Sequence, residues 1–165
     1  MKTNENLMKA FGGESQANRM YLAFAMQAEN EGYENIARVF RAIAEGETIH
    51  ALKHFEVAGK IGSTVENLEE AAKGEEYEYT DMYPEFIEKA KEEDQGKAVK
   101  SFERANEAEK VHGKTYTELK KIVEEGKDLE DKEIKLCPVC GWVGIDDIPE
   151  RCPICSTPSN RFEDY

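Results

Sequence analysis

The 165-residue sequence is long enough to form one domain with a core, with room for a small appendage. Its formal net charge of -13 at pH 7 would repel phosphate backbones, so we expect no nucleic-acid partner. The longest apolar run, near residues 21–26, is far shorter than the roughly 20 residues of a membrane-spanning helix, and the N-terminus lacks the apolar core of a secretory signal, so we expect a cytoplasmic protein without a membrane partner.

The first predicted helix covers residues 4–31, with Asn4 as its N-cap and Gly32 as its stop. Apolar residues recur at helical spacing along one face of this helix, and Glu14 falls in the middle of that face. A glutamate in that position is either buried against a cation or misplaced.

The second predicted helix covers residues 34–58 and carries the motif Glu47-Thr48-Ile49-His50 on its apolar face. A Glu and a His three residues apart lie one turn apart on the same side of a helix. One inward Glu or His is more often a rim or core residue than a ligand. Glu47, His50 and His54 follow one another on the same stripe, and this run favours ligation, although His54 is the weakest candidate.

The third segment begins with a capping-box pattern, Ser63-Thr64-Val65-Glu66, and should end between residues 93 and 96. Two carboxylates, Glu75 and Glu78, interrupt its apolar face. Pro84 removes a backbone donor, so it should kink or split the helix near Tyr83.

The fourth predicted helix covers residues 97–125 and repeats the earlier motif as Glu109-Lys110-Val111-His112. A charged linker over residues 124–135 follows it. The second and fourth helices align with one another at an offset of 62 residues, and the first and third share a Gly-Glu pair. This repeat predicts that a duplicated helix pair brings two metal half-sites together around an approximate twofold axis.

The inward acids of these helices predict a metal centre. They are Glu14, Glu47, Glu75, Glu78 and Glu109. Five bare carboxylates cannot be buried together without cations, and with His50 and His112 they nearly satisfy two metal ions of charge two or three. Carboxylates with a minority of nitrogen ligands suit iron or manganese, and this pattern is that of a two-metal carboxylate bundle. The alternative is a solvated bundle with acidic patches.

All four cysteines lie near the end of the chain, as Cys137-Pro138-Val139-Cys140 and Cys152-Pro153-Ile154-Cys155. Two C-x-x-C pairs at this spacing predict a four-thiolate metal site, whereas structural disulfides would be expected only in a secreted chain. A pair of redox disulfides is the alternative. The ligands alone do not separate iron from zinc.

Over essentially its whole length the sequence resembles the rubrerythrins. The motifs that carry the resemblance are Gly13-Glu14-Ser15-Gln16-Ala17, Glu47-Thr48-Ile49-His50, Gly74-Glu75, Glu78-Tyr79-Thr80-Asp81-Met82-Tyr83-Pro84, Glu109-Lys110-Val111-His112 and the two Cys-Pro-x-Cys pairs. The resemblance implies an all-α, ferritin-like four-helix bundle with two non-haem irons over residues 1–130. A small rubredoxin-like domain, a β domain of zinc-ribbon type, would follow over residues 131–165 with one iron on its cysteines, or zinc in recombinant protein. Ser156 departs from the Gly or Ala common after the last cysteine, and would be strained if that position needs a positive φ.

The function that the resemblance implies is reduction of hydrogen peroxide to water in defence against oxidative stress. The bundle irons would supply the electrons, and the four-cysteine iron would return them from an NADH- or NADPH-dependent reductase or a rubredoxin. Glu47 and Glu109 would bridge the irons, Glu14 and Glu75 would be terminal ligands, and Glu78 would exchange with His50. Tyr21 and Tyr83 would hydrogen-bond the acids or the peroxide, with core packing as the alternative. The family also favours a homodimer or a higher homo-oligomer.

Two other functions compete with peroxide reduction. A ferritin-like iron store or ferroxidase would use the same bundle but would have no need of a four-cysteine electron-transfer domain. A zinc-ribbon adaptor with a helical spacer would explain the cysteines but not the buried acids. Iron content and colour separate these alternatives.

Overall fold

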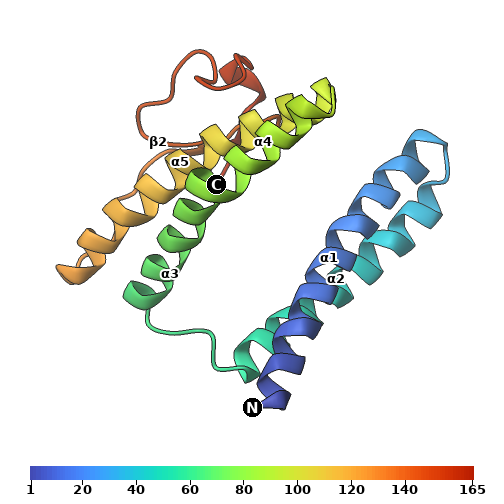
Figure 1. The fold of residues 1–165 in the computed structure, drawn as a ribbon, viewed down its shortest axis with the longest axis horizontal. Helices are drawn as coiled ribbons and strands as arrows, with labels where there is room; N and C mark the ends of the chain where they lie inside the picture. The colour runs from blue at the N-terminus through green and yellow to red at the C-terminus, as the bar shows by residue number, and fades with distance from the viewer. The chain divides into compact units, whose positions relative to one another are not determined.

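The computed structural model describes residues 1–165 and divides into two compact units, Met1–Gly62 and Ser63–Tyr165. In Figure 1 the first unit runs from blue to cyan-green and the second from green to red. None of the helices combines the length and the apolar character needed to cross a membrane.

The first unit is a pair of helices, α1 (Lys2–Asn30) and α2 (Glu34–Val57), which lie side by side in Figure 1. The turn between them needs Gly32, whose φ of 83° lies in the left-handed region that favours glycine. The predicted stop at Gly32 is therefore confirmed. The predicted start is wrong by two residues, because the Asn4 amide donates to the Met1 carbonyl and Asn4 lies inside the helix.

Small side chains form the contact line between α1 and α2. The buried residues there are all alanines: Ala25, Ala28, Ala37, Ala44 and Ala51. Alanines at a helix contact allow the two backbones to approach closely. A polar link fixes their register, since the Asn18 side-chain amide donates to the Ala44 carbonyl at 2.7 Å and to the Thr48 hydroxyl at 2.9 Å.

The second unit begins with a helix that is interrupted where the sequence predicts a break. Its parts are α3 (Thr64–Tyr77), the π-helical turn η1 (Glu78–Met82) and α4 (Tyr83–Glu92). Ser63 and Glu66 form the expected capping box. Pro84 has no amide hydrogen to donate, and the wider π-helical turn just before it absorbs the mismatch.

The long helix α5 (Gly96–Glu124) packs against α3, η1 and α4. Gly113 makes the α3 contact close. A Cβ atom added there would lie 3.3 Å from the Cβ of Glu75 and 3.4 Å from a ring carbon of Tyr79. This glycine therefore sets how near α5 comes to the glutamate of α3.

The C-terminal part of the second unit is a three-stranded antiparallel sheet in the order β2-β1-β3. Its strands are β1 (Ile134–Leu136), β2 (Val143–Ile145) and β3 (Glu163–Asp164), with a 3-10 turn, η2 (Ser159–Arg161), before the last. Its core combines two cysteines with Trp142 and Phe162, and Val111 of α5 packs against this core. The cysteine domain therefore lies on α5 within the same unit.

Candidate metal centres

The first unit gathers Glu14 from α1 with Glu47 and His50 from α2. One ligand atom from each lies within 4.8 Å of the other two. The His50 Nδ1 lies 3.0 Å from a Glu47 carboxylate oxygen, yet the His50 side chain is 60% exposed. His54, the weakest predicted ligand, is not part of this cluster. The first cluster is thus a preformed half-site whose imidazole is exposed and held at one ring nitrogen only.

The second unit gathers the equivalent set, Glu75 from α3 with Glu109 and His112 from α5, again within 4.8 Å of one another. The His112 Nδ1 lies 2.6 Å from a Glu109 carboxylate oxygen. This imidazole is only 22% exposed. Its Nε2 lies 2.8 Å from the carbonyl oxygen of Gly141, the residue after Cys140. The second half-site is therefore tied directly to the cysteine domain.

Both hydrogen bonds of His112 end on acceptors, a carboxylate and a carbonyl oxygen. The ring satisfies both at once only as the imidazolium cation, which donates from both nitrogens. The bond to Glu109 and, less strongly, the bond to Gly141 accordingly raise the pKa of His112. A metal ion at Nδ1 would replace one proton while Nε2 continues to donate to Gly141. A carbonyl that holds the second ring nitrogen of a ligating histidine fixes its tautomer and orientation.

The carboxylates of the second cluster share a proton at neutral pH. Burial, reinforced by the hydrogen bond and charge of Glu109, raises the pKa of Glu75 to about 7. The hydrogen bond from His112 holds the pKa of Glu109 below its usual range. Burial and the charge of Glu109 also raise the pKa of Glu78, so this extra acid faces the same cluster. Carboxylates brought together in this way are arranged for a cation.

Two tyrosines of the second unit face the acids. Burial, then the charges of Glu78 and Glu109, raise the pKa of Tyr83. Burial, then the charges of Glu75 and Glu109, likewise raise the pKa of Tyr116, a residue of the site that the sequence pattern does not predict. The sequence does carry one signal for Tyr116: it lies four residues after His112, on the same face of the helix. In the first unit, Tyr21 lies near aromatic rings, with centroids 6.3 Å from Phe24 and 6.5 Å from Phe40.

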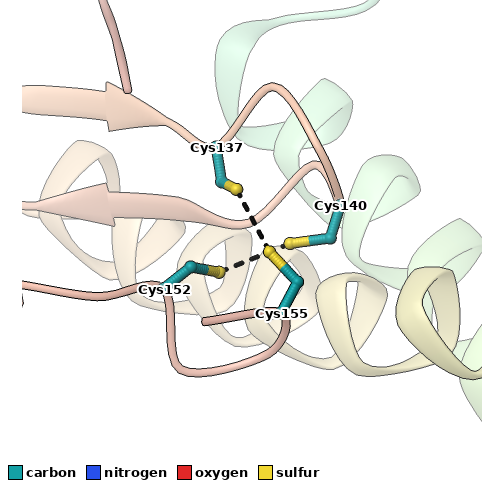
Figure 2. Close-up of side chains that lie close together, drawn as sticks. All are labelled: Cys137, Cys140, Cys152 and Cys155. Carbon is teal, nitrogen blue, oxygen red and sulfur yellow. Dashed lines mark hydrogen bonds between the residues drawn. The ribbon is translucent and has the colours of Figure 1, made fainter. Parts of the chain in front are cut away.

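The four cysteines converge on one point, as Figure 2 shows. Their sulfurs all lie within 4.8 Å of one another, with 3.5 Å between Cys137 and Cys155 and 3.4 Å between Cys140 and Cys152. Tetrahedral ligation with metal–sulfur bonds of about 2.3 Å places neighbouring sulfurs about 3.8 Å apart. The four thiolates therefore fit one tetrahedral metal ion.

The two cysteine loops are built alike. The Cys137 amide donates to the Trp142 carbonyl and the Cys152 amide to the Thr157 carbonyl, each at 2.8 Å. The residue after each loop has a positive φ, 80° at Gly141 and 60° at Ser156. The strain expected at Ser156 is thus present.

The Cys155 thiol is the one held most readily as a thiolate. Burial opposes its ionisation, but hydrogen bonds from the Thr157 hydroxyl and amide and from other cysteines outweigh burial. They lower the pKa of Cys155 to about 6. A ready thiolate favours metal binding, because the thiolate is the ligand.

Comparison with known proteins places these centres in a family. Residues 5–120 match the model of the rubrerythrin family, and residues 136–163 match the model of the rubrerythrin rubredoxin-like domain. The chain belongs to the rubrerythrin family. It is 38% identical to rubrerythrin-2 of Clostridium acetobutylicum, over 99% of this chain and 96% of the relative. It is 40% identical to rubrerythrin of Porphyromonas gingivalis, over 98% of this chain and 89% of that one.

Solved structures agree with this assignment. The chain is similar to nigerythrin in a partially reduced state, at 38% identity and a TM-score of 0.61, over 99% of this chain and 86% of that chain. It is likewise similar to the fully reduced, all-ferrous nigerythrin, at 38% identity and a TM-score of 0.61. The predicted fold class, a four-helix bundle followed by a small antiparallel sheet with a four-cysteine site, is confirmed, as is the rubrerythrin resemblance.

Proposed function

We propose that this rubrerythrin-family protein is a non-haem di-iron peroxidase that reduces hydrogen peroxide to water in the cytoplasm. The observation that carries the proposal is the hydrogen bond between His112 and Gly141, which joins the second carboxylate cluster to the four-cysteine site. An iron store needs no such connection, whereas a peroxidase must be supplied with electrons after every turnover. We infer that the electrons come from an NADH- or NADPH-dependent reductase, directly or through a rubredoxin.

In this proposal the two clusters together hold two irons, and the cysteines hold one. Glu14 and Glu75 would be terminal ligands, Glu47 and Glu109 would be bridging candidates, and His50 and His112 would be the nitrogen ligands. The donor set fits iron, because carboxylate oxygens outnumber imidazole nitrogens in the bundle and four thiolates suit a single iron. When bound, the two bundle irons supply the two electrons that cleave the O–O bond of hydrogen peroxide.

The chain's own residues handle protons. With its pKa raised to about 7, the Glu75 carboxyl is about half protonated at pH 7 in the metal-free protein and would release this proton when a metal binds. Tyr83 and Tyr116 stay protonated at all physiological pH values, so their hydroxyls are donors for a peroxide oxygen. We propose the same role for Tyr21 in the first unit. Glu78 has no counterpart in α1, the equivalent helix of the repeat. We propose that it is the ligand that would exchange with His50. Structures of both redox states with unmoved metals would refute this exchange.

The partners follow from the same proposal. We propose a homodimer or larger homo-oligomer. Within its own unit α2 leaves Ile49 and Leu52 exposed, at 62% and 60%, which gives the helical pair an apolar surface for further packing. The domain boundary near residue 130 stays a prediction.

The proposal is tested with Cys152→Ser. This change should abolish reductase-coupled peroxide turnover, yet the chemically reduced bundle should still react once with hydrogen peroxide. The purified native protein should be red and hold about three irons per chain. Full steady-state activity in Cys152→Ser would show that the cysteine site is not the relay, and a colourless protein with zinc alone would refute the peroxidase.

A further inference from the structure

We propose that a basic groove beside Cys140 is the docking site of an acidic electron-donor protein. The inference rests on the proposed function and names the surface through which electrons arrive. The groove has a volume of about 450 Å³ and lies between the start of α5 and the first cysteine loop. Its lining includes Lys97, Lys100, Ser101, Arg104, Val139 and Cys140.

The cations of this groove lie on one face of α5. Lys97, Lys100 and Arg104 are three and four residues apart, so their side chains share one side of the helix. The first turn of α5 carries no acidic residue, and its free amides add positive charge at that end. The groove is therefore a positive surface on a chain whose net charge is -13.

These three cations are also unpaired. All three side chains are exposed, and none forms an ion pair. By contrast, other lysines of the same unit are neutralised by acids, as in Lys91 with Glu103 at 3.2 Å and Lys120 with Glu69 at 2.8 Å. Unpaired charges on one face attract a partner of opposite charge over several ångströms and raise its association rate.

The groove opens onto the cysteine site. Cys140 lines it, and Val139 is 41% exposed at its edge. The next residue, Gly141, accepts the hydrogen bond from His112. A donor seated in the groove would thus meet the cysteine loop one residue away from the contact that leads to the second carboxylate cluster.

The lining favours a protein over a nucleotide. No aromatic ring lines the groove to stack on a nicotinamide or adenine. An open surface with cations around a small apolar point is instead typical of transient electron-transfer contacts, which are small and guided by charge. In each encounter one electron passes from the donor, which is oxidised, to the iron held by the four thiolates, which is reduced, and no bond is made or broken.

The test uses the iron-loaded full chain and a reduced, free-standing rubredoxin of negative net charge. Reduction of the oxidised cysteine site is followed by its visible absorption in stopped flow. The variant Lys97→Glu with Lys100→Glu and Arg104→Glu should lower the second-order rate at least tenfold and remove its decrease with added salt. The matched control, Lys2→Glu with Lys9→Glu and Lys60→Glu, makes the same change in net charge on the first unit and should stay within twofold of the native rate.

A second measurement separates this proposal from the proposed function. With reduced methyl viologen as donor, the groove variant should reduce hydrogen peroxide at the native rate, which shows that both metal sites are intact. Equal rubredoxin rates in the native and groove variants, or equal losses in the groove and control variants, would overturn the docking site and leave the peroxidase standing. Binding of NADPH or inorganic phosphate in the groove of the native protein, with no change in the rate at which rubredoxin reduces the cysteine site, would also overturn the docking site.

Discussion

The two halves of the helical repeat carry the same ligand motif in different surroundings. The His50 side chain is 60% exposed and bonds only to its own Glu47, whereas His112 is 22% exposed and is held at both ring nitrogens. The second half also has a π-helical turn that begins at Glu78 and a domain packed on α5. A repeated motif therefore specifies which atoms can ligate, while the surroundings decide which ligand is fixed and which is free to move.

The largest expected difference between the halves is in metal retention. His112→Ala should lower the bundle metal from about two ions to about one or fewer per chain, because it removes a fixed ligand. His50→Ala should keep nearly all the metal of the oxidised protein and slow peroxide turnover. Metal analysis measures the first effect, and the visible spectrum of the cysteine site controls for folding. Equal metal loss in both variants would remove the distinction between the halves.

The shared proton of the second half should make the metal-free protein sensitive to pH. The pKa of Glu75 is raised from 4.5 to about 7, so its contribution to stability is complete below pH 4.5 and is lost as pH rises through about 7. Because this carboxyl is only partly buried, solvent screening reduces the effect, and we expect the free energy of unfolding to fall by about 1 kcal/mol between pH 5 and pH 8 from this group.

Glu75→Gln isolates that contribution, because the amide keeps a donor toward Glu109 and does not titrate. Chemical unfolding of the metal-free variant should show a smaller loss of stability between pH 5 and pH 8 than the native chain. An unchanged pH dependence would mean that another group, such as His112, causes it.

Helix packing should also distinguish the halves. Gly113→Ala places its Cβ 3.3 Å from the Cβ of Glu75, so the α3–α5 contact must widen by a few tenths of an ångström, and this should outweigh the gain in helix propensity for a net loss of about 0.5 kcal/mol. The repeat places Ala51 at the equivalent position in α2. The control is Gly46→Ala, where an added Cβ meets nothing within 4 Å, and which should stabilise α2 by about 0.5 kcal/mol. Thermal unfolding compares the stabilities of the two metal-free variants. A stabilising Gly113→Ala would show that the contact between α5 and α3 accommodates the added methyl group without widening.

The smallest effect concerns the two cysteine loops, which repeat one another as the helices do. Ser156→Gly should stabilise the metal-bound domain by about 0.5 kcal/mol, since glycine adopts the φ of 60° more easily. Ser156→Ala keeps the Cβ and should bring no gain. The stability of both variants is measured by unfolding the protein and monitoring the loss of the metal–thiolate absorption. Equal stability of the glycine and alanine variants would show that the positive φ does not strain Ser156.

Much of this protein could be predicted from the order of its residues. Local signals predict the ends of the helices to within two residues. These signals are the helical periodicity, the capping box at Ser63 and the stop at Gly32, and each acts over one or two turns. The spacing of the cysteines predicted a four-sulfur cluster, and the acids on apolar stripes predicted the two carboxylate–histidine clusters. The predicted start of the first helix is wrong, because Asn4 is a good cap but the preceding residues can continue the helix.

What the sequence could not predict are contacts between residues far apart in the chain. The bond from His112 to Gly141, the place of Tyr116 beside the acids and the groove between Lys97 and Cys140 all arise when the cysteine domain and α3 pack on α5. The sequence by itself determined the candidate ligands, since a metal is chosen by the types and local spacing of donor atoms. Only the tertiary structure decided which histidine is held at both nitrogens and which cations lie beside the cysteine loop, because orientation and exposure depend on packing between distant segments.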